Sequence, residues 1–414
     1  MEFAAFAATA GTIDEESADL EIQSLVAETL RDSDDLPTLV RFLLGRVFPA
    51  HDSRTLDIGP RLCYEAIARA AGQNVDADDV ETRLADVGEI GAVAASYEFG
   101  GQQGLAAFGG GGRDPLTVAE VEGQLRELAA VDGAGSQETK LDILFGLFNR
   151  CGDDEARYLA RLVLSEMRIG VGGGTVRDAI AEAFDVPTEA VERALQLSND
   201  YGLVAATARE EGKTGLADIH LELGRPVQAM LAQTGTVGGA LTDWNEVGVE
   251  VKYDGARVQV HYDGADVSLY SRNMENVTDP LPEIVTTIEE RVDVPVILDG
   301  EVVAVDDSGD PLPFQEVLRR FRRKHDVAKA REDVSLRLHA FDCLHVDGED
   351  LLDAPLTERH DRLADCFGGT DAPEVSRLWL RDDADEIEDI EAATLEAGHE
   401  GIMLKNPDAE YSPG

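Results

Sequence analysis

The sequence predicts a multidomain protein in which an all-α domain is followed by an α+β domain with antiparallel sheets. From about residue 20 to residue 205, apolar residues recur at spacings of three and four, which is typical of amphipathic helices. After about residue 225 the pattern changes to alternation with period two, which is typical of strands. At 414 residues, the chain is long enough for two or three domains with cores of their own.

We place the helical domain at residues 1–215, where Gly, Pro and Asp separate the periodic segments. The clearest helical segments are LEIQSLVAETLRD, LPTLVRFLLGRV, CYEAIARAAG, LDILFGLFNR and EARYLARLVLSEM. The stretch FGGQQGLAAFGGGGRD at 99–114 predicts a flexible loop because it is rich in glycine.

A junction at residues 216–235, near Gly- and Thr-rich segments, precedes the second domain at 236–414. This domain begins with GVEVKYDGARVQVHYDGADVSLYSRN, which alternates with period two and contains a hairpin turn at Asp263-Gly264. Further strands are predicted in PVILDGEVVAVDD, SLRLHAFDCLHVDGEDL and EGIMLKN, and a helix in PFQEVLRRFRRKHDVAKA.

The charge balance is strongly acidic, with 83 Asp and Glu against 36 Lys and Arg and a net charge of −47. High net charge accompanies disorder in some proteins, but the apolar periodicity here predicts folded domains. The better interpretation is a protein adapted to high salt, where screening limits repulsion between carboxylates to short range. An acidic surface also disfavours nonspecific binding to DNA, so any DNA contact must come from local basic patches.

The sequence predicts a soluble, cytoplasmic protein that does not contact a membrane. No apolar run reaches the length of a membrane span, and the segment MEFAAFAATAGTIDEE lacks the basic region of a signal peptide. The four cysteines have no zinc-site spacing and are interpreted as isolated thiols.

Three common catalytic motifs are excluded by their spacing. Gly212-Lys213-Thr214 resembles the end of a P-loop, but the required earlier glycine is replaced by Thr207. The run Gly170–Gly174 fails the G-x-G-x-x-G pattern because Thr175 follows it. The G-x-S-x-G elbow of serine hydrolases does not occur in the sequence.

The informative segments follow one another in a fixed order along the second domain. A K-x-D-G segment, Lys252-Tyr253-Asp254-Gly255, is weak evidence alone because a lysine before an Asp-Gly turn is common. The segments that strengthen it are Ser271-Arg272-Asn273, Asp299-Gly300-Glu301, Phe341-Asp342 and Glu400-Gly401-Ile402-Met403-Leu404-Lys405.

In this order the segments resemble the nucleotidyltransferase motifs of ATP-dependent DNA ligases. The segments FQEVLRRFRRKHD and RIGVGGGTVRDAIAEAF are also similar to the archaeal and eukaryotic members of that group. The resemblance covers nearly the whole chain apart from the first twenty or so residues, and together with the acidic composition it points to a haloarchaeal type. It implies a helical DNA-binding domain, then a nucleotidyltransferase (adenylation) domain.

The resemblance implies that the Lys252 amine attacks the α-phosphate of ATP, releases pyrophosphate and keeps AMP on nitrogen. Phosphoryl transfer depends mainly on positioning and charge neutralisation, so Mg²⁺, carboxylates and cations are the expected parts. A cationic field from Arg257, Arg272, Lys405 and Mg²⁺ would favour the neutral, nucleophilic amine. The implied roles are adenine recognition by Glu250, stacking on adenine by Phe341, ribose contact by Arg257 and Glu301, phosphate contact by Arg272 and Lys405, and metal binding by Glu301 and Glu400.

Plainer interpretations of these residues stay open at this point. Phe341 could belong to the core, Glu301 and Glu400 could be solvated carboxylates at strand ends, and Arg272 could pair with one of the many acids.

Two groups of residues are candidate DNA contacts. A glycine-rich loop here leads into a predicted helix, and helix N-termini with free N–H groups bind phosphate. Because the helical domain resembles the ligase DNA-binding domain, the resemblance implies DNA contact by Arg168, Gly170, Gly172, Gly173 and Thr175. The second group is the densest basic cluster, which precedes His325 and comprises Arg319, Arg320, Arg322, Arg323 and Lys324. This cluster could hold DNA phosphates or form ion pairs with nearby acids. The implied partners are nicked double-stranded DNA and ATP, and a sliding clamp is a further candidate partner.

The chain departs from the family's pattern at its end, Tyr411-Ser412-Pro413-Gly414. In the family a lysine-rich strand, the last nucleotidyltransferase motif, and an OB-fold domain follow, and both are absent from this chain. We therefore expect a truncated form that lacks parts which the family uses to seal nicks.

Other functions share part of this pattern. An RNA ligase or an mRNA-capping enzyme also carries K-x-D-G, but the long helical region before Lys252 argues against both. A capping enzyme transfers GMP, so labelling with GTP rather than ATP would distinguish it from a DNA ligase. An NAD⁺-dependent DNA ligase has different neighbouring segments. A noncatalytic DNA-binding scaffold is disfavoured by the intact Lys252, Arg257, Glu301 and Glu400.

Overall fold

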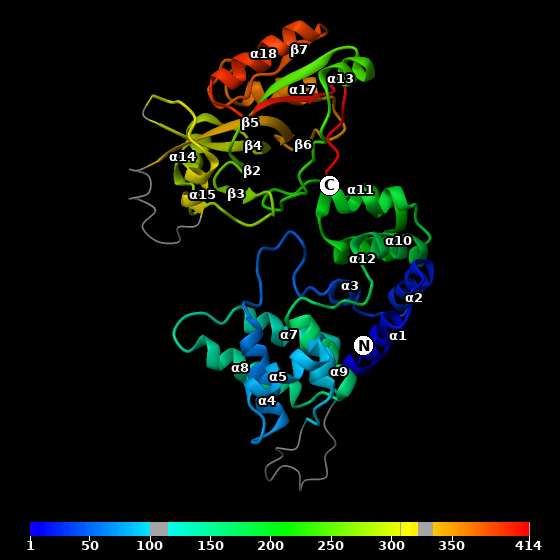
Figure 1. Ribbon diagram of the computed structural model, residues 1–414. Helices are drawn as coiled ribbons and strands as arrows, with labels where there is room; N and C mark the ends of the chain where they lie inside the picture. The colour runs from blue at the N-terminus through cyan, green and yellow to red at the C-terminus, as the bar shows by residue number, and fades with distance from the viewer. Residues whose placement is uncertain (100–114, 307, 322–333, 414) are drawn as a thin grey trace. The chain divides into compact units, whose positions relative to one another are not determined.

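The computed structural model describes residues 1–99, 115–306, 308–321 and 334–413 (Figure 1). The chain divides into two compact units, Met1–Leu195 with Asp200–Ile219, and Gln196–Asn199 with His220–Gly414. The predicted loop at 99–114 lies, apart from Phe99, outside the described residues. In the described part of the chain, no helix is both long and apolar enough to cross a membrane.

The first unit is helical in its described parts, as predicted. Its helices are α1 (Phe3–Asp14), α2 (Asp19–Arg31), α3 (Leu36–Leu43), α4 (Pro60–Ala71), α5 (Ala77–Val87), α6 (Ile90–Ala95), α7 (Val118–Ala129), α8 (Ser136–Phe148), α9 (Asp153–Val163), α10 (Gly173–Phe184), α11 (Thr188–Ser198) and α12 (Tyr201–Ala217). Side-chain caps begin several of them: Asp35 accepts from Thr38 N–H at 3.3 Å, and Asp76 and Thr117 form capping boxes.

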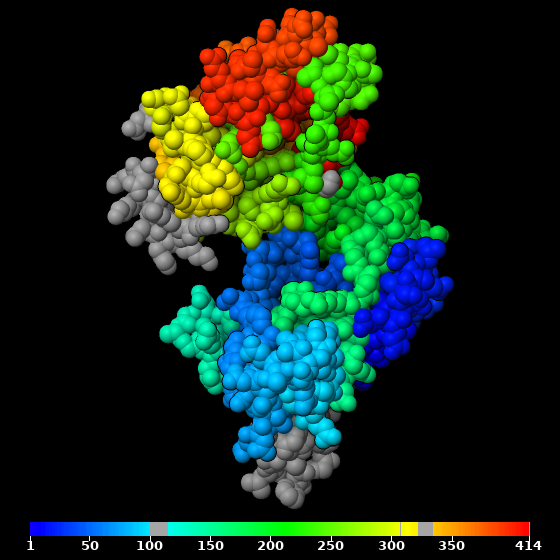
Figure 2. All heavy atoms as spheres, viewed as in Figure 1, coloured from blue at the N-terminus to red at the C-terminus, as the bar shows by residue number. Residues whose placement is uncertain are grey.

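Helices distant in sequence share the core of this unit. Helix α2 packs on α10, α3 on α12, α4 on α8 and α6 on α9. Figure 2 shows the dark blue N-terminal residues against the green residues that include α10. Helix α1 lies in the segment before the predicted helices, and its Phe3, Phe6 and Ile13 are fully buried. Helix α1 therefore contributes to the core of the first unit.

The second unit contains two antiparallel sheets, as predicted. The smaller has the order β7-β1-β8 and is packed against helices α13 and α18 through Val247, Val249 and Ile387. These elements are β1 (Val247–Lys252), β7 (Trp379–Arg381), β8 (Gly401–Lys405), α13 (Val237–Trp244) and α18 (Ala384–Glu396).

The larger sheet has the order β3-β2-β4-β5-β6. Its elements are β2 (Ala256–Tyr262), β3 (Val267–Ser271), β4 (Val296–Val305), β5 (Ser335–Val346) and β6 (Glu349–Asp350), with helices α14 (Pro282–Arg291), α15 (Phe314–Phe321) and α17 (Leu356–Cys366) beside it. The predicted hairpin joins β2 to β3, where Gly264 has a φ of +95° that suits glycine. The core includes Val258, Leu298 and Val302, which share one face of the sheet because side chains alternate along a strand.

Candidate active site

The pairing of β1 with β8 brings Lys252 next to Glu400. Lys252 ends β1 opposite Gly401, and the backbone N–H of Glu400 donates to the carbonyl of Lys252 at 3.1 Å. The Lys252 ammonium forms an ion pair with the Glu400 carboxylate. Their side chains are 49% and 42% exposed, so a molecule from solution can reach the lysine nitrogen.

Two residues earlier in β1, Glu250 is buried and holds Lys405. The Lys405 nitrogen lies 2.6 Å from Oε2 of Glu250, whose side chain is only 3% exposed. Burial raises the pKa of Glu250, and the Lys405 charge opposes that effect. Among the described residues, Oε1 of Glu250 has no hydrogen-bond partner. A buried acceptor without a partner is unusual and suits an N–H donor from a ligand.

Two cations lie close to the ring of Phe341. The Lys405 nitrogen is 4.8 Å and the Arg257 guanidinium carbon 5.5 Å from its ring centroid, within the range of cation–π attraction. Phe341 is half-buried and lies outside the core clusters of the described residues. The structure therefore places it beside the other predicted site residues.

A β-bulge directs Phe341 to this place. Asp299 of β4 pairs with Asp342 of β5, whereas the next residue, Gly300, pairs with Ala340. Phe341 is thus the extra residue, and such a bulge turns a side chain out of the regular alternation. A Cβ on Gly300 would lie 3.0 Å from the Cα of Ala340, so any side chain there would press against the backbone of the opposing strand.

Arg257 is held in place by Asp299. Its Nε and Nη2 donate to the two carboxylate oxygens of Asp299 at 3.0 and 2.6 Å, a two-point ion pair. Asp299 also accepts a hydrogen bond from the Tyr411 hydroxyl at 2.8 Å. Asp299 belongs to the motif Asp299-Gly300-Glu301, but the sequence predicted no role for it. No sequence pattern pointed to Tyr411.

Glu301 lies opposite Arg257 in the β2–β4 pairing. Burial raises the pKa of Glu301 to about 8, against the opposing charge of Arg257, and the nearby carboxylates of Asp299, Glu400 and Asp254 raise it further. The carboxyl group is therefore mostly protonated at neutral pH unless a cation comes close.

The glycine of K-x-D-G is explained by close packing. A Cβ on Gly255 would lie 2.5 Å from the carbonyl oxygen of Val302 and 2.7 Å from Cγ of Glu301. The backbone after Lys252 can approach β4 only because this side chain is missing. The motif aspartate, Asp254, accepts from the backbone N–H of Phe314 at 3.1 Å.

Tyr253, between Lys252 and Asp254, packs against two histidines that the sequence analysis did not identify. Its ring stacks on His339 with centroids 4.3 Å apart, and His399 meets it edge-on at 5.3 Å. Burial lowers the pKa of His339 to about 4, so this wall beside the lysine carries no charge from His339 at neutral pH.

Arg272 is not joined to this cluster by a hydrogen bond or ion pair. It follows β3 and is exposed, and within the described ranges its side chain forms no ion pair with an acid. Its predicted role therefore stays a prediction. The described residues also contain no group of three or more His, Cys, Asp or Glu side chains placed to hold a metal ion.

Comparisons with known proteins identify the family. The family model "DNA ligase N terminus" matches residues 2–181, and the model "ATP dependent DNA ligase domain" matches residues 229–414. A DNA ligase of Haloarcula marismortui is 72% identical over all of this chain and 75% of its own length. The chain belongs to the ATP-dependent DNA ligases.

A second relative of this ligase, from Haloferax volcanii, is 64% identical over the whole chain and 76% of its own length. Both relatives come from halophilic archaea, which agrees with the acidic composition. The ligase spans about three quarters of the length of these relatives. A solved chain named Pmar-Lig_Pre matches 99% of this ligase and 75% of its own length with a TM-score of 0.57 at 14% identity, which supports the fold alone.

The described members of the basic cluster near α15 differ in burial and in their partners. Arg320 is 2% exposed and donates to the carbonyls of Val334 and Pro280 and to Glu283, so its charge is used inside the ligase. We therefore correct the prediction and remove Arg320 from the candidate DNA contacts. Arg319 is exposed and pairs with Glu316 at 2.7 Å. Arg322, Arg323 and Lys324 lie outside the described residues.

The glycine-rich loop of the helical unit leads into α10, as its sequence suggested. Arg168 is 62% exposed, has a φ of +51° and pairs with Glu166 at 2.7 Å. Gly170 has a φ of +73°, Gly172 caps α10, and Thr175 lies in its first turn. Gly173 has a packing reason of its own, because a Cβ there would collide with the hydroxyl of Tyr201.

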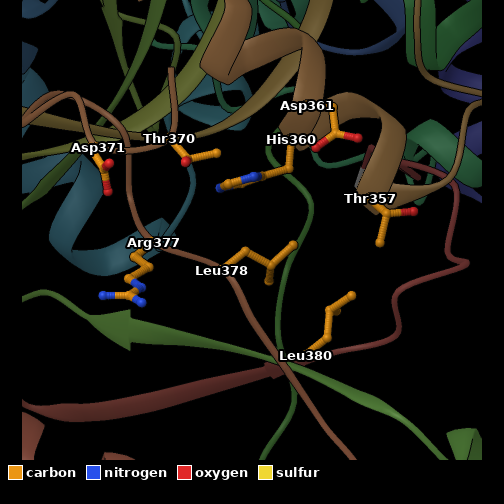
Figure 3. A pocket seen from close by; sticks show the side chains of 8 residues that line it. All are labelled: Thr357, His360, Asp361, Thr370, Asp371, Arg377, Leu378 and Leu380. Atoms are coloured by element: carbon orange, nitrogen blue, oxygen red, sulfur yellow. The ribbon is translucent and has the colours of Figure 1, made fainter.

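A cavity of about 360 Å³ lies elsewhere in the second unit, between α17 and β7 (Figure 3). His360 of α17 lines it, with Nε2 2.7 Å from the carbonyl oxygen of Ser376. None of the predicted site residues lines this cavity.

Proposed function

We propose that this protein seals nicks between a 3′-hydroxyl and a 5′-phosphate in duplex DNA, in replication, repair and recombination, through AMP bound to Lys252. The helical domain at 1–215 would bind DNA, and the domain at 236–414 would react with ATP. The supporting observation is a cluster of side chains. In it, exposed Lys252 ends β1 beside the Glu400 carboxylate. Near them lie Oε1 of Glu250, which is buried and has no hydrogen-bond partner among the described residues, and the Phe341 ring with two cations close to it. RNA ligase, capping enzyme and scaffold are less favoured, because the identity to DNA ligases extends over the whole chain.

Adenine would stack on Phe341 and direct its amino group to Oε1 of Glu250. That oxygen is buried and lacks a donor among the described residues, and the adenine amino group is a donor. Guanine carries a carbonyl oxygen at the corresponding position, which a carboxylate repels. This arrangement therefore favours ATP over GTP.

The ribose and phosphates would extend from Phe341 toward Lys252. Arg257 and Glu301, which face each other across β2 and β4, would contact the ribose. Lys405 now pairs with Glu250, and it would exchange that carboxylate for a phosphate when adenine arrives. Arg272 would contact a phosphate of ATP or the 5′-phosphate of the nick.

The Lys252 nitrogen would form a bond to the α-phosphorus while the bond from that phosphorus to the bridging oxygen breaks and pyrophosphate leaves. An ammonium group has no free electron pair. The ion pair of Lys252 with Glu400 must therefore open, and the nitrogen must lose a proton, before attack.

Mg²⁺ would be held by Glu301 and Glu400 together with phosphate oxygens, since Mg²⁺ in nucleotide sites commonly uses one or two carboxylates. The raised pKa of Glu301 fits this assignment, because a carboxyl group crowded by other acids gains most from a nearby cation. When bound, the metal would neutralise charge on the phosphates.

DNA would contact the loop from Arg168 to Thr175 and the N-terminus of α10, where backbone N–H groups suit phosphate. Arg319 is the exposed arginine of α15 that would join them. Contact with a sliding clamp stays a prediction without a described surface to support it.

Self-adenylation tests the proposal. The full-length enzyme with α-labelled ATP and Mg²⁺ in high salt should acquire a label that is lost in acid and kept in base, as expected of a phosphoramidate. Lys252→Ala should abolish it, whereas Lys213→Ala, at an exposed lysine of the helical unit, should not. Undiminished labelling of Lys252→Ala, or equal labelling by GTP, would contradict the proposal.

A further inference from the structure

Residues 220–230, which we call the strap, have no helix or strand but are fixed to the larger sheet. The side-chain amide of Gln259 in β2 bonds both the N–H and the carbonyl of Val227, each at 3.0 Å, as a neighbouring strand would. The backbone N–H of Gly224 donates to Nδ1 of His261 at 3.1 Å. Burial lowers the pKa of His261 to about 3, so its ring is neutral and Nδ1 can accept.

The strap reaches the nucleotide cluster at Met230. The Met230 carbonyl accepts a hydrogen bond from Nη1 of Arg257 at 2.6 Å, and its N–H donates to the Tyr411 hydroxyl at 3.1 Å. That hydroxyl donates in turn to Asp299 at 2.8 Å and lies 3.4 Å from Nη2 of Arg257. One oxygen atom thus joins the strap, the carboxylate and the arginine.

This group is buried and its hydrogen-bond directions are fixed. Tyr411 is 2% and Asp299 1% exposed. Burial raises the pKa of Tyr411, so the phenol keeps its proton and donates it to the carboxylate. With its Nε and Nη2 on Asp299 and its Nη1 on Met230, Arg257 has little freedom to rotate.

We propose that Tyr411 is a positioning residue for ATP binding: its hydroxyl joins Met230 and Asp299 to Arg257 and so fixes the guanidinium beside the Phe341 ring. This inference rests on the proposed function, in which Arg257 contacts the ribose. Tyr411 itself does not touch the nucleotide. Its loss therefore changes the affinity for ATP more than the rate of the chemical step.

Removing the hydroxyl separates this role from a general effect on folding. Tyr411→Phe keeps the buried ring but leaves the Met230 N–H without its acceptor and Asp299 without one donor. The two-point ion pair between Arg257 and Asp299 survives, so the arginine is displaced rather than released. Tyr270→Phe is the matched control, because it removes a hydroxyl that donates to the strap at the Gly224 carbonyl, at 2.7 Å.

The test is nick sealing by the full-length enzyme with ATP varied, in high salt. Tyr411→Phe should raise KM for ATP about tenfold, the scale of one hydrogen bond to a charged group, with kcat changed less than about twofold. Its preference for ATP over 2′-deoxy-ATP should also fall. Tyr270→Phe should leave KM unchanged.

A double-mutant cycle decides whether Tyr411 acts through Arg257. In an Arg257→Lys background, Tyr411→Phe should have little further effect on KM. An unchanged KM in Tyr411→Phe, an equal rise in Tyr270→Phe, or full additivity with Arg257→Lys would overturn the inference. If Tyr411→Phe does not fold, Asp299→Asn tests the same link and should also raise KM. Labelling of the wild type at Lys252 is a separate readout, so its failure would count against the proposed function.

Discussion

Replacing Glu301 by Gln should raise the free energy of unfolding of the second unit, and the gain should grow with pH. Burial raises the pKa of Glu301 from its ordinary value of 4.5 to about 8. Between these two values the folded state binds a proton that the unfolded state has lost, so the wild type becomes less stable as pH rises. Glutamine keeps the shape of the side chain and cannot titrate.

The size of the effect follows from the two pKa values. A difference of about 3.5 between them corresponds to about 5 kcal/mol when both transitions are complete. Between pH 5 and pH 8 the wild type should lose about 1.4 kcal/mol per pH unit relative to Glu301→Gln. Above pH 8 the difference between the two proteins should level off, because both states of the wild type are then ionised.

The two tryptophans offer a direct assay, since Trp244 and Trp379 both belong to the second unit. Urea unfolding followed by tryptophan fluorescence, in molar KCl without nucleotide or metal, should be recorded at several pH values. Glu396→Gln, at an exposed position at the end of α18, is the control for loss of one charge. Parallel pH dependences for wild type and Glu301→Gln would refute the reasoning, as would the same divergence in the control.

Three further changes test other parts of the site and the surface. Phe341→Leu keeps apolar bulk but loses the ring face, so ATP affinity should fall about two- to tenfold in equilibrium binding; a large drop in Tm with unchanged binding would make Phe341 a core residue instead. Gly255→Ala places a Cβ 2.5 Å from the carbonyl oxygen of Val302, so the loop must shift at a cost of about 1–3 kcal/mol. The rate of self-adenylation should then fall at least about tenfold, and normal labelling would contradict the packing argument. Nick sealing should rise with KCl toward about 1 M, where the Debye length is about 3 Å. A protein that circular dichroism shows folded near 0.1 M, and that is most active there, would contradict the interpretation of high-salt adaptation.

Much of the candidate site could be predicted because the motif residues lie on strands or within a few residues of a strand end. Period-two alternation places Glu250 and Lys252 on the same face of β1, and the structure brings Lys405 of β8 and Glu400, which directly precedes β8, beside them. The order of the motifs along the chain gave these residues their proposed roles. The pairing of the strands and the distances between side chains required the structure.

Other features depend on tertiary contacts that no pattern in the sequence records. The direction of Phe341 comes from a bulge in the β4–β5 register, and a count of alternating residues cannot reveal it. Arg320 stands in a run of basic residues, yet α15 turns it inward to Glu283. The role of Tyr411 depends on its hydrogen bond to Asp299, which lies 112 residues away in the chain. The junction predicted at 216–235 contains the strap, which side chains of β2 attach to the sheet.

The proposed DNA contacts of Arg168 and Arg319 would let a protein of charge −47 bind DNA at high salt. Arg168 and Arg319 each already pair with a carboxylate, Glu166 and Glu316, both at 2.7 Å. A DNA phosphate must therefore replace one anion by another, and salt screens the pair that is lost as well as the pair that forms. Because these two effects partly cancel, DNA affinity should fall less steeply with salt than in a protein whose arginines have no carboxylate partners. The comparison is for the same number of arginine–phosphate contacts. Repulsion between the acidic surface and DNA decreases over the same range, so added salt can favour association overall.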